Sequence, residues 1–280
     1  MVALCISRLS YNQQVALWAN GRQIGDTMAK YNKPIIGKAP QPKNKGTLTI
    51  AWCDNGMVDG KFTEGLMAIG VQAPGNGIPI SHTLRVQGNQ IGRQRQALTD
   101  HWIDNIKSDW ILWIDSDIVV DINMIAQLWD LADAVHRPIV SGIYFISKER
   151  EGSLASPVPC IFNRVTDNSI QHIHPLPENQ LIKIDSAGMG LVIMHRSVFI
   201  KLREMFPNQS LFAEQEGLGE NFVGEDIVFF NKVFRAGIPV HAHTGIIAAH
   251  MKRFALDYDY YSLYWGMVEM KKKIQQQSKE

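Results

Sequence analysis

The chain has 280 residues, a formal net charge of +1, and contents of 45% hydrophobic and 20% charged residues. This composition is ordinary for a globular protein, and the balanced charge provides no general attraction to nucleic acid or to an anionic membrane. The length is sufficient for one substantial α/β domain with a modest extension.

The chain carries no pattern of a membrane-spanning or secreted protein. No apolar run approaches the roughly 18 residues that span a bilayer, and the first residues lack the features of a signal peptide. Cys5, Cys53 and Cys160 are widely spaced and form no C-x-x-C pair. Free thiols fit this spacing better than a disulfide framework or a zinc site. We therefore expect a cytoplasmic protein, of a bacterial cell or of a phage-infected host.

The first half of the chain alternates between strand and helix patterns. Residues 1–45, with a stretch rich in lysine and proline, are interpreted as an N-terminal extension and linker. Strands are predicted at 47–52, 82–87, 109–114 and 137–145, and helices at 62–69, 89–106 and 123–134. This alternation predicts an α/β fold in which helices cover both faces of a mostly parallel central sheet.

The second half has shorter strands that are separated by turns. Its one clear helix pattern, at 225–237, ends on a glycine, as helices commonly do. Residues 46–255 are therefore interpreted as one domain and 256–280 as a C-terminal helical tail. In the tail, Tyr260, Leu263, Tyr264 and Met267 form an amphipathic pattern that suggests a homodimer.

The stretch WILWIDSDIVVD is an apolar strand pattern that ends on two carboxylates, Asp115 and Asp117. The carboxyl ends of parallel strands face the crevice in which open α/β sheets bind ligands. In an extended segment both side chains point to the same side and repel one another, unless a cation lies beside them. A hard divalent ion that also binds diphosphate oxygens would remove this repulsion. In the structural alternative, one aspartate caps the next turn and the other is solvated.

Several segments between Thr47 and Met251 resemble, in order, nucleotide-sugar glycosyltransferases with the GT-A fold, of the family 2 type. LWIDSDI resembles the D-x-D signature, and NQIGRQRQAL resembles the segment that opens a helix beside the donor nucleotide. IDSAGMGLVIM is similar to the strand that lines the sugar pocket. FVGEDIVFF and AAHM resemble the acidic segment and the segment with a distant metal-binding histidine. Gln94 stands where the family usually has asparagine, which leaves only Arg93 matched.

The resemblance implies a metal ion, Mn²⁺ or Mg²⁺, that is bound by Asp117 and His250. Asp115 would contact the metal, its bound water or the donor ribose. Ligation by oxygen and imidazole suits Mn²⁺ better than Mg²⁺. His241 and His243, which share one strand face, are competing candidates for a metal site.

The resemblance also makes Asp226 the candidate general base, with Glu225 beside it. The alternative is that both acids only complement the dipole of the helix that they open. Inversion at the anomeric carbon is favoured, although the family fold supports retention as well.

Further residues are implied in donor binding: Trp52, Asp54, Arg93, Ser116, Gly188 and Gly190. The two glycines would let the donor sugar approach the backbone. For the tryptophan the alternative is a place in the core, and for the arginine a solvated position on a helix.

The predicted function is the transfer of a sugar from a nucleotide donor, with UDP favoured over GDP, to an acceptor hydroxyl. The acceptor is left open, and hydroxymethylcytosine in phage DNA is a specific candidate. Lysines of the 33–45 stretch and Lys271 to Lys273 would then contact phosphates, or else are solvated surface. The alternatives are a metal-dependent phosphoesterase or nucleotidyltransferase and a non-catalytic protein that binds nucleotide sugars.

Overall fold

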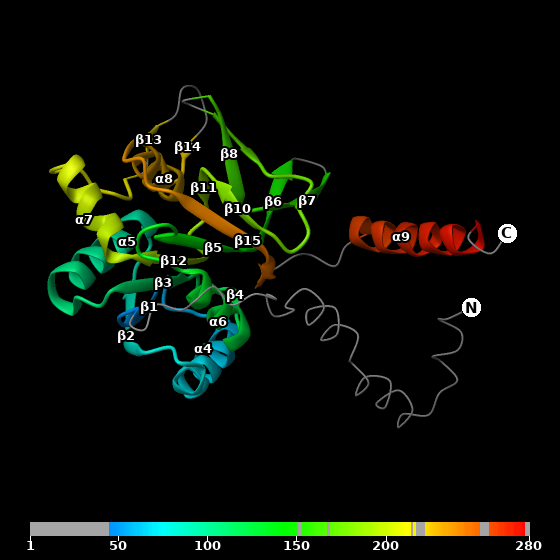
Figure 1. Cartoon of the computed structure of the whole chain (residues 1–280). Helices are drawn as coiled ribbons and strands as arrows, with labels where there is room; N and C mark the ends of the chain where they lie inside the picture. The colour runs from blue at the N-terminus through cyan, green and yellow to red at the C-terminus, as the bar shows by residue number, and fades with distance from the viewer. Residues whose placement is uncertain are drawn as a thin grey trace.

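The structure is a computed structural model that describes residues 45–150, 153–166, 169–213, 215–216, 222–252 and 258–277. Residues 1–44, which make up nearly all of the predicted extension, lie outside the described part. A mixed sheet forms the centre of the domain (Figure 1). Its strands, in spatial order, are β10 (Leu181–Ile184), β15 (Val240–Ile247), β5 (Ile139–Ile143), β12 (Leu191–His195), β3 (Trp110–Ile114), β1 (Leu48–Asp54) and β2 (Ile80–Gln87).

Most of these strands run in the same direction. β1 is parallel to both β2 and β3, and β15 is parallel to β5. β12 is antiparallel to its neighbours β3 and β5, and β10 is antiparallel to β15. Hence only β12 and β10 oppose the other five strands, and the predicted mostly parallel sheet is confirmed.

Helices cover both faces of the sheet, as predicted. The helices α4 (Gly60–Gln72) and α6 (Ile122–Leu131) pack on one face. The other face carries α5 (Ile91–His101), α7 (Arg196–Met205) and α8 (Glu225–Arg235). Side chains of β3 alternate between the two cores, since successive residues of a strand point to opposite faces. Trp110, Leu112 and Ile114 join one core, whereas Ile111 and Trp113 join the other.

Short elements surround the sheet. Two are helical turns, η1 (Pro74–Asn76) and η2 (Trp102–Ile106). The others are the strands β4 (Ile118–Val119), β6 (Phe145–Arg150), β7 (Ser153–Pro159), β8 (Ile161–Thr166), β9 (Ser169–His172), β11 (Ser186–Ala187), β13 (Gln215–Glu216), β14 (Phe222–Val223) and β16 (Ala249–His250). They pair as β11–β8–β9, β13–β14, β16–β4 and β6–β7. The pairing of β16 with β4 brings the end of the domain back to the segment that follows β3.

Two helices differ from the sequence prediction. The helix expected at 89–106 is divided into α5 and the π-helical turn η2, which ends where Lys107 takes a positive φ of 62°. The helix α7 was not predicted, although Val198, Phe199 and Leu202 have the spacing of a buried helix face. By contrast, α8 ends as expected, because Gly237 adopts the left-handed conformation, with φ 63°, just after its last turn.

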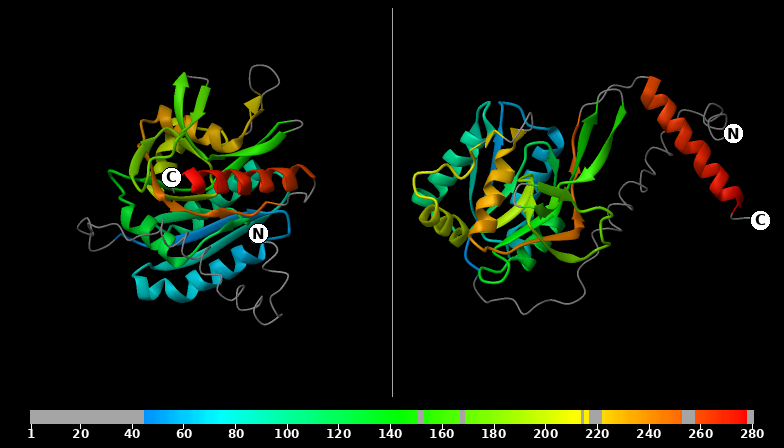
Figure 2. Two further views of the ribbon diagram at one scale, coloured as in Figure 1. Left: turned by 90° about the vertical axis from the view of Figure 1, so that its right-hand side faces the viewer. Right: turned by 90° about the horizontal axis from the view of Figure 1, so that it is seen from above.

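The predicted tail helix is present as α9 (Tyr258–Gln277). Figure 1 and the right-hand view of Figure 2 show it apart from the sheet and its covering helices. Among the described residues, no helix combines the length and the apolar character that crossing a bilayer requires.

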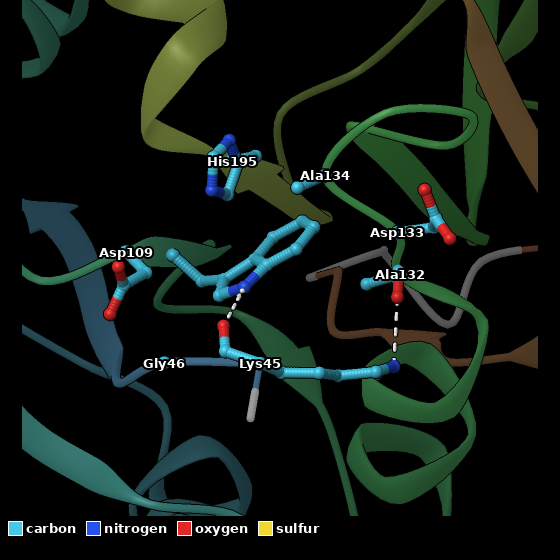
Figure 3. Close-up of a pocket in the computed structure, with 8 residues that line it drawn as sticks. Lys45, Gly46, Asp109, Ala132, Asp133, Ala134 and His195 are labelled. Carbon is cyan, nitrogen blue, oxygen red and sulfur yellow. Dashed lines mark hydrogen bonds between the residues drawn. The ribbon is translucent and has the colours of Figure 1, made fainter. Parts of the chain in front are cut away.

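A cavity of about 350 Å³ lies at the end of β3 opposite to the carboxylates (Figure 3). The polar groups around it are bound to one another. The Lys45 ammonium donates to the carbonyl oxygens of Trp129, Asp130 and Ala132 at the end of α6, and Trp110 Nε1 donates to Lys45 O at 2.8 Å. These bonds fix the chain where it enters β1. Lys45 therefore binds carbonyl groups of the protein itself, whereas the sequence suggested a phosphate contact for the lysines of residues 33–45.

Gly65 and Gly70 lie on the same helix, α4, in opposite surroundings. A methyl group on Gly65 would overlap the carbonyl oxygen of Val120, whereas one on Gly70 would meet nothing within 4 Å. We expect Gly65→Ala to lower the free energy of unfolding by roughly 1–3 kcal/mol through overpacking. Gly70→Ala should raise it by up to about 1 kcal/mol, because alanine is the better helix former. Urea unfolding followed by tryptophan fluorescence tests both, and equal effects of the two substitutions would contradict the packing of α4.

Candidate functional site

The two carboxylates that follow β3 lie in a turn. Ile118 N donates to Asp115 O at 2.9 Å, so residues 115–118 form a four-residue turn with Ser116 and Asp117 at its centre. The expectation of an extended segment with both carboxylates on one side is therefore wrong. Each aspartate instead has cationic partners of its own.

Asp117 is bound to two residues from the segment that includes β16. Its Oδ2 lies 3.0 Å from His250 Nε2 and 3.0 Å from Lys252 Nζ. The backbone contributes as well, since Met251 N donates to Asp117 O at 2.8 Å. Burial of Asp117 favours its neutral form, but the hydrogen bonds from His250 and Lys252 outweigh burial and hold its pKa below the ordinary value.

The orientation of His250 is set by a backbone carbonyl. Its Nδ1 lies 2.9 Å from Phe145 O. A carbonyl oxygen can only accept, so Nδ1 carries a hydrogen. Nε2 then donates to Asp117 Oδ2 when the ring is charged and is an acceptor when the ring is neutral. In the neutral ring it faces another acceptor, Asp117 Oδ2, and a metal ion between them would satisfy both. Histidines that bind metal ions commonly donate their second nitrogen to a carbonyl in this way.

Two side chains are too few to hold a metal ion on their own. Among the described residues, no group of three or more His, Cys, Asp or Glu side chains is placed to bind one. Asp117 and His250 therefore fit a metal ion that takes its other ligands from water and from a diphosphate, as Mg²⁺ and Mn²⁺ do in nucleotide sites. The competing histidines belong to β15, where His243 Nδ1 accepts from Gly245 N at 3.2 Å.

Asp115 is held by an arginine that was not among the predicted site residues. Arg95, which is 4% exposed, donates from Nη2 to Asp115 Oδ1 at 2.8 Å and from Nη1 to Glu225 Oε1 at 2.7 Å. It thereby joins the end of β3 to the start of α8. The sequence held a signal for it, because Arg95 lies four residues after Ile91 and three before Leu98, on the apolar face of α5. A charged residue on a buried face requires a buried partner.

Asp226 lies next to this ion pair without an arginine of its own. Its Oδ1 accepts from Ile227 N at 2.7 Å at the start of α8. Burial of the carboxyl group raises its pKa to about 6, and the neighbouring Glu225 adds to the shift, while Arg95 opposes it. A carboxyl group with such a pKa is still ionised at neutral pH and is a stronger base than an ordinary aspartate.

The side chain that closely approaches Gly188 and Gly190 is that of Tyr144. A side chain on Gly188 would overlap the Tyr144 hydroxyl, and one on Gly190 would lie 2.8 Å from Tyr144 Cζ. Gly190 N also donates to Tyr144 Oη at 3.2 Å. The buried Tyr144 ring thus explains the need for both glycines, and its edge packs against His250 with 5.3 Å between the ring centres.

The other residues expected to bind the donor are divided between the core and the surface. Asp54 is buried and bound by Arg85, whose hydrogen bonds lower its pKa. Trp52 packs edge-on against Phe62 at 5.7 Å between ring centres. Arg93 is exposed on α5. Gln94, at the position of the usual asparagine, is buried and donates to the backbone of Asp54 and Val86.

A cavity of about 320 Å³ lies beside the turn that carries Asp117. It is lined by Asn55, Met57, Val58, Asp59, Ser116, Asp117, Met251 and Lys252. Two of these segments are joined by a backbone hydrogen bond: Asp59 N, at the start of α4, donates to Ser116 O at 2.9 Å. The cavity therefore brings the predicted Ser116 and Asp117 together with a lysine, at the carboxyl ends of β1 and β3, where such sheets bind ligands.

No protein-family model matches this chain, and no curated protein matches it. Solved structures resemble it in the course of the backbone. The crystal structure of A197 from STIV has 15% sequence identity and a TM-score of 0.48, over 74% of this chain and 86% of that chain. The structure of GalNAc-T7 with UDP, GalNAc and Mn²⁺ has 10% identity and a TM-score of 0.49, over 75% of this chain and 44% of that one.

A third structure is that of a glycosyltransferase involved in the glycosylation of the major capsid of PBCV-1. It has 12% identity and a TM-score of 0.36, over 75% of this chain and 94% of that chain. At these identities and TM-scores the likeness extends to the general course of the backbone and says nothing of function.

The raised pKa of Asp226 predicts a stability effect that depends on pH. In the unfolded chain this carboxyl group ionises near 3.8, and in the folded protein near 6. Ionisation therefore destabilises the fold increasingly between these values and fully above pH 6. Asp226→Asn should stabilise the protein more at pH 7.5 than at pH 4.5, by on the order of 2 kcal/mol.

The neighbouring Glu225 provides the control with the opposite sign. Glu225→Gln removes one partner of the buried Arg95 and should destabilise the protein at pH 7.5 by roughly 1–3 kcal/mol. Denaturant unfolding at the two pH values measures both substitutions. A stabilisation by Asp226→Asn that is the same at both values would show that the carboxyl group is not buried as described.

Proposed function

We propose that this protein is a metal-dependent glycosyltransferase that moves a sugar from a nucleotide donor, UDP in the first instance, to an acceptor hydroxyl. The observation that carries the proposal is the pairing of Asp117 Oδ2 with Nε2 of His250, whose Nδ1 is anchored to a backbone carbonyl. This pair lies beside a cavity at the carboxyl end of the sheet. The motifs described in the sequence analysis support the same reaction.

Asp117 and His250 would hold a Mn²⁺ or Mg²⁺ ion, which when bound neutralises charge on the departing diphosphate. Lys252, whose side chain is 53% exposed, adds a positive charge at the same carboxylate. The Lys252 ammonium would contact phosphate oxygens in the adjoining cavity. Asp115, fixed by Arg95, would face the donor ribose or a metal-bound water.

Asp226 is the proposed general base. It removes the proton from the acceptor hydroxyl as that oxygen attacks the anomeric carbon, and the bond from this carbon to the diphosphate oxygen breaks. A single displacement of this kind inverts the anomeric centre. Glu225 is paired with the Arg95 guanidinium. The neighbouring carboxylate, Asp226, is therefore the one that is available to accept the proton.

The donor site predicts mutual dependence of metal and nucleotide binding. Because two ligands are all that the described part of the chain supplies, Mn²⁺ alone should bind weakly and UDP should bind tightly only with Mn²⁺. Asp117→Ala should weaken Mn²⁺-dependent UDP binding at least tenfold, since it removes a metal ligand. Calorimetric titration of UDP, and then of GDP, with and without Mn²⁺ measures this effect.

The matched control is Asp104→Ala, which removes a carboxylate that is paired with Arg203 on the surface. It should leave nucleotide binding unchanged. If neither UDP nor GDP binds in a Mn²⁺-dependent way, the proposed function is wrong and the Asp117–His250 pair is structural.

The proposed base predicts a separation of catalysis from binding. Asp226→Asn should lower kcat about 10²- to 10⁴-fold while leaving Mn²⁺-dependent UDP binding intact. For the wild type, the rate should rise with pH through about 6 and then level off, because the base acts in its ionised form. Transfer from UDP-sugars to a panel of acceptors, with hydroxymethylated duplex DNA and lipid-linked glycans included, provides the assay. A variant that retains the wild-type rate would exclude Asp226 as the base.

A further inference from the structure

The helix α9 exposes an unusual set of large apolar side chains. Six of them, all between residues 261 and 270, are 40% to 65% exposed: Tyr261, Leu263, Tyr264, Trp265, Met267 and Met270. Among the described residues, their ring contacts are made within the helix, where Trp265 lies 6.3 Å from Tyr261 and 5.5 Å from Tyr264 between ring centres. Figure 1 and the right-hand view of Figure 2 show that the helix projects away from the domain.

These six side chains cover a wide sector of the helix. At about 100° per residue they spread over about 220° of its circumference, with Met270 and Trp265 at the two borders. The remaining sector carries Ser262, Gly266 and Glu269. Between residues 261 and 270, α9 is therefore apolar over a sector much wider than the narrow seam of a two-stranded coiled coil. Lys271 and Lys272 project from the same sector in the following turn, so this end of the helix is basic.

A helix of this composition requires a surface to stabilise it. Most helices in proteins owe their stability to the packing of an apolar face, and tyrosine, tryptophan and glycine are weaker helix formers than alanine or leucine. Water contact with six large apolar groups is a further cost, which burial of that sector would remove.

The charges and the residue types indicate which surface fits. Lys271, Lys272 and Lys273 follow the apolar stretch directly, and all are exposed. Lys272 pairs with Glu269 at 2.5 Å, which leaves a net charge of +2 on these four residues. Tyrosine and tryptophan favour the boundary between water and lipid, where the ring is buried and the polar group stays wet. Lysines close to this boundary attract anionic lipid headgroups.

We propose that α9 is an interfacial anchor, which lies in the headgroup region of an anionic bilayer with its wide apolar sector towards the acyl chains. An apolar stretch of about ten residues is too short to cross a bilayer, and its aromatic side chains and adjoining lysines suit a helix that lies at the membrane surface. This inference is independent of the proposed function.

The anchor would also place the candidate site. α9 begins six residues after Lys252, a distance that an extended chain spans in at most about 20 Å. Asp117, His250 and Lys252 would therefore act close to the bilayer surface. An acceptor that is held by the membrane would meet the site without free diffusion through the solution.

Flotation of the full chain with lipid vesicles tests the proposal. The probes are vesicles of phosphatidylcholine alone and vesicles of phosphatidylcholine with phosphatidylglycerol in a two-to-one ratio. We expect flotation with the anionic vesicles and a decrease in high salt. The double variant Leu263→Ser/Met267→Ser should bind at least tenfold more weakly. Replacing all three lysines with glutamine should reduce binding to anionic vesicles by about fivefold for each lysine that contacts the surface.

The matched control is Met67→Ser/Val71→Ser, which removes two apolar side chains that are 69% and 82% exposed on α4. It should bind vesicles like the wild type. Thermal unfolding of all variants should match that of the wild type, since the changed side chains are exposed. Flotation that is absent, or that the α9 variants do not reduce, would overturn the proposal. So would light scattering that shows a dimer without lipid that dissociates on Leu263→Ser/Met267→Ser, because a second copy would then cover the apolar sector.

Discussion

The arrangement of the candidate site depends on one buried guanidinium. Arg95 lies between Asp115 at the end of β3 and Glu225 at the start of α8, with N–O distances of 2.8 and 2.7 Å. In a poorly solvated position such a charge is tolerated only when its donors are paired, so the two carboxylates are obliged to stay on either side of it. This single constraint fixes α5, α8 and the turn after β3 relative to one another. It also decides which of the neighbouring acids is left for chemistry.

The two ends of the sheet are organised in opposite ways. At the amino-terminal end of β3, Lys45, Trp110 and the carbonyl groups of α6 satisfy one another, and the chain is tied to the sheet. At the carboxyl end, charged groups gather: Asp226 has a raised pKa, and one carboxylate oxygen of Asp117 is shared between His250 and Lys252. Groups with a perturbed pKa are characteristic of functional sites. The proposed chemistry is therefore assigned to the carboxyl end, although both ends have cavities of similar size.

Return of the chain to the end of β3 completes the site. β16 pairs with β4 directly after the turn, which sets His250 opposite Ile118 and Lys252 against Asp117. The same segment leads into α9 within a few residues. The position of the helix in relation to a membrane and the position of the site are thus connected through one short stretch of chain. This connection gives the otherwise separate tail helix a direct relation to the proposed reaction.

Periodicity and end signals in the sequence determined the α/β class and the mostly parallel sheet. They also determined the helix that ends before Gly237, and they located the acidic residues at the ends of strands and helices. These properties depend on local patterns, which short segments carry by themselves. The pairing of Asp117 with His250, across 133 residues, agrees with what the motifs implied. Only the tertiary structure decided that the D-x-D segment turns, that Arg95 and not Arg93 is buried among the acids, and that Tyr144 fills the space at Gly188 and Gly190. Each of these depends on which distant groups share a poorly solvated space, and hydrogen-bond and charge balance there is a property of the folded chain as a whole.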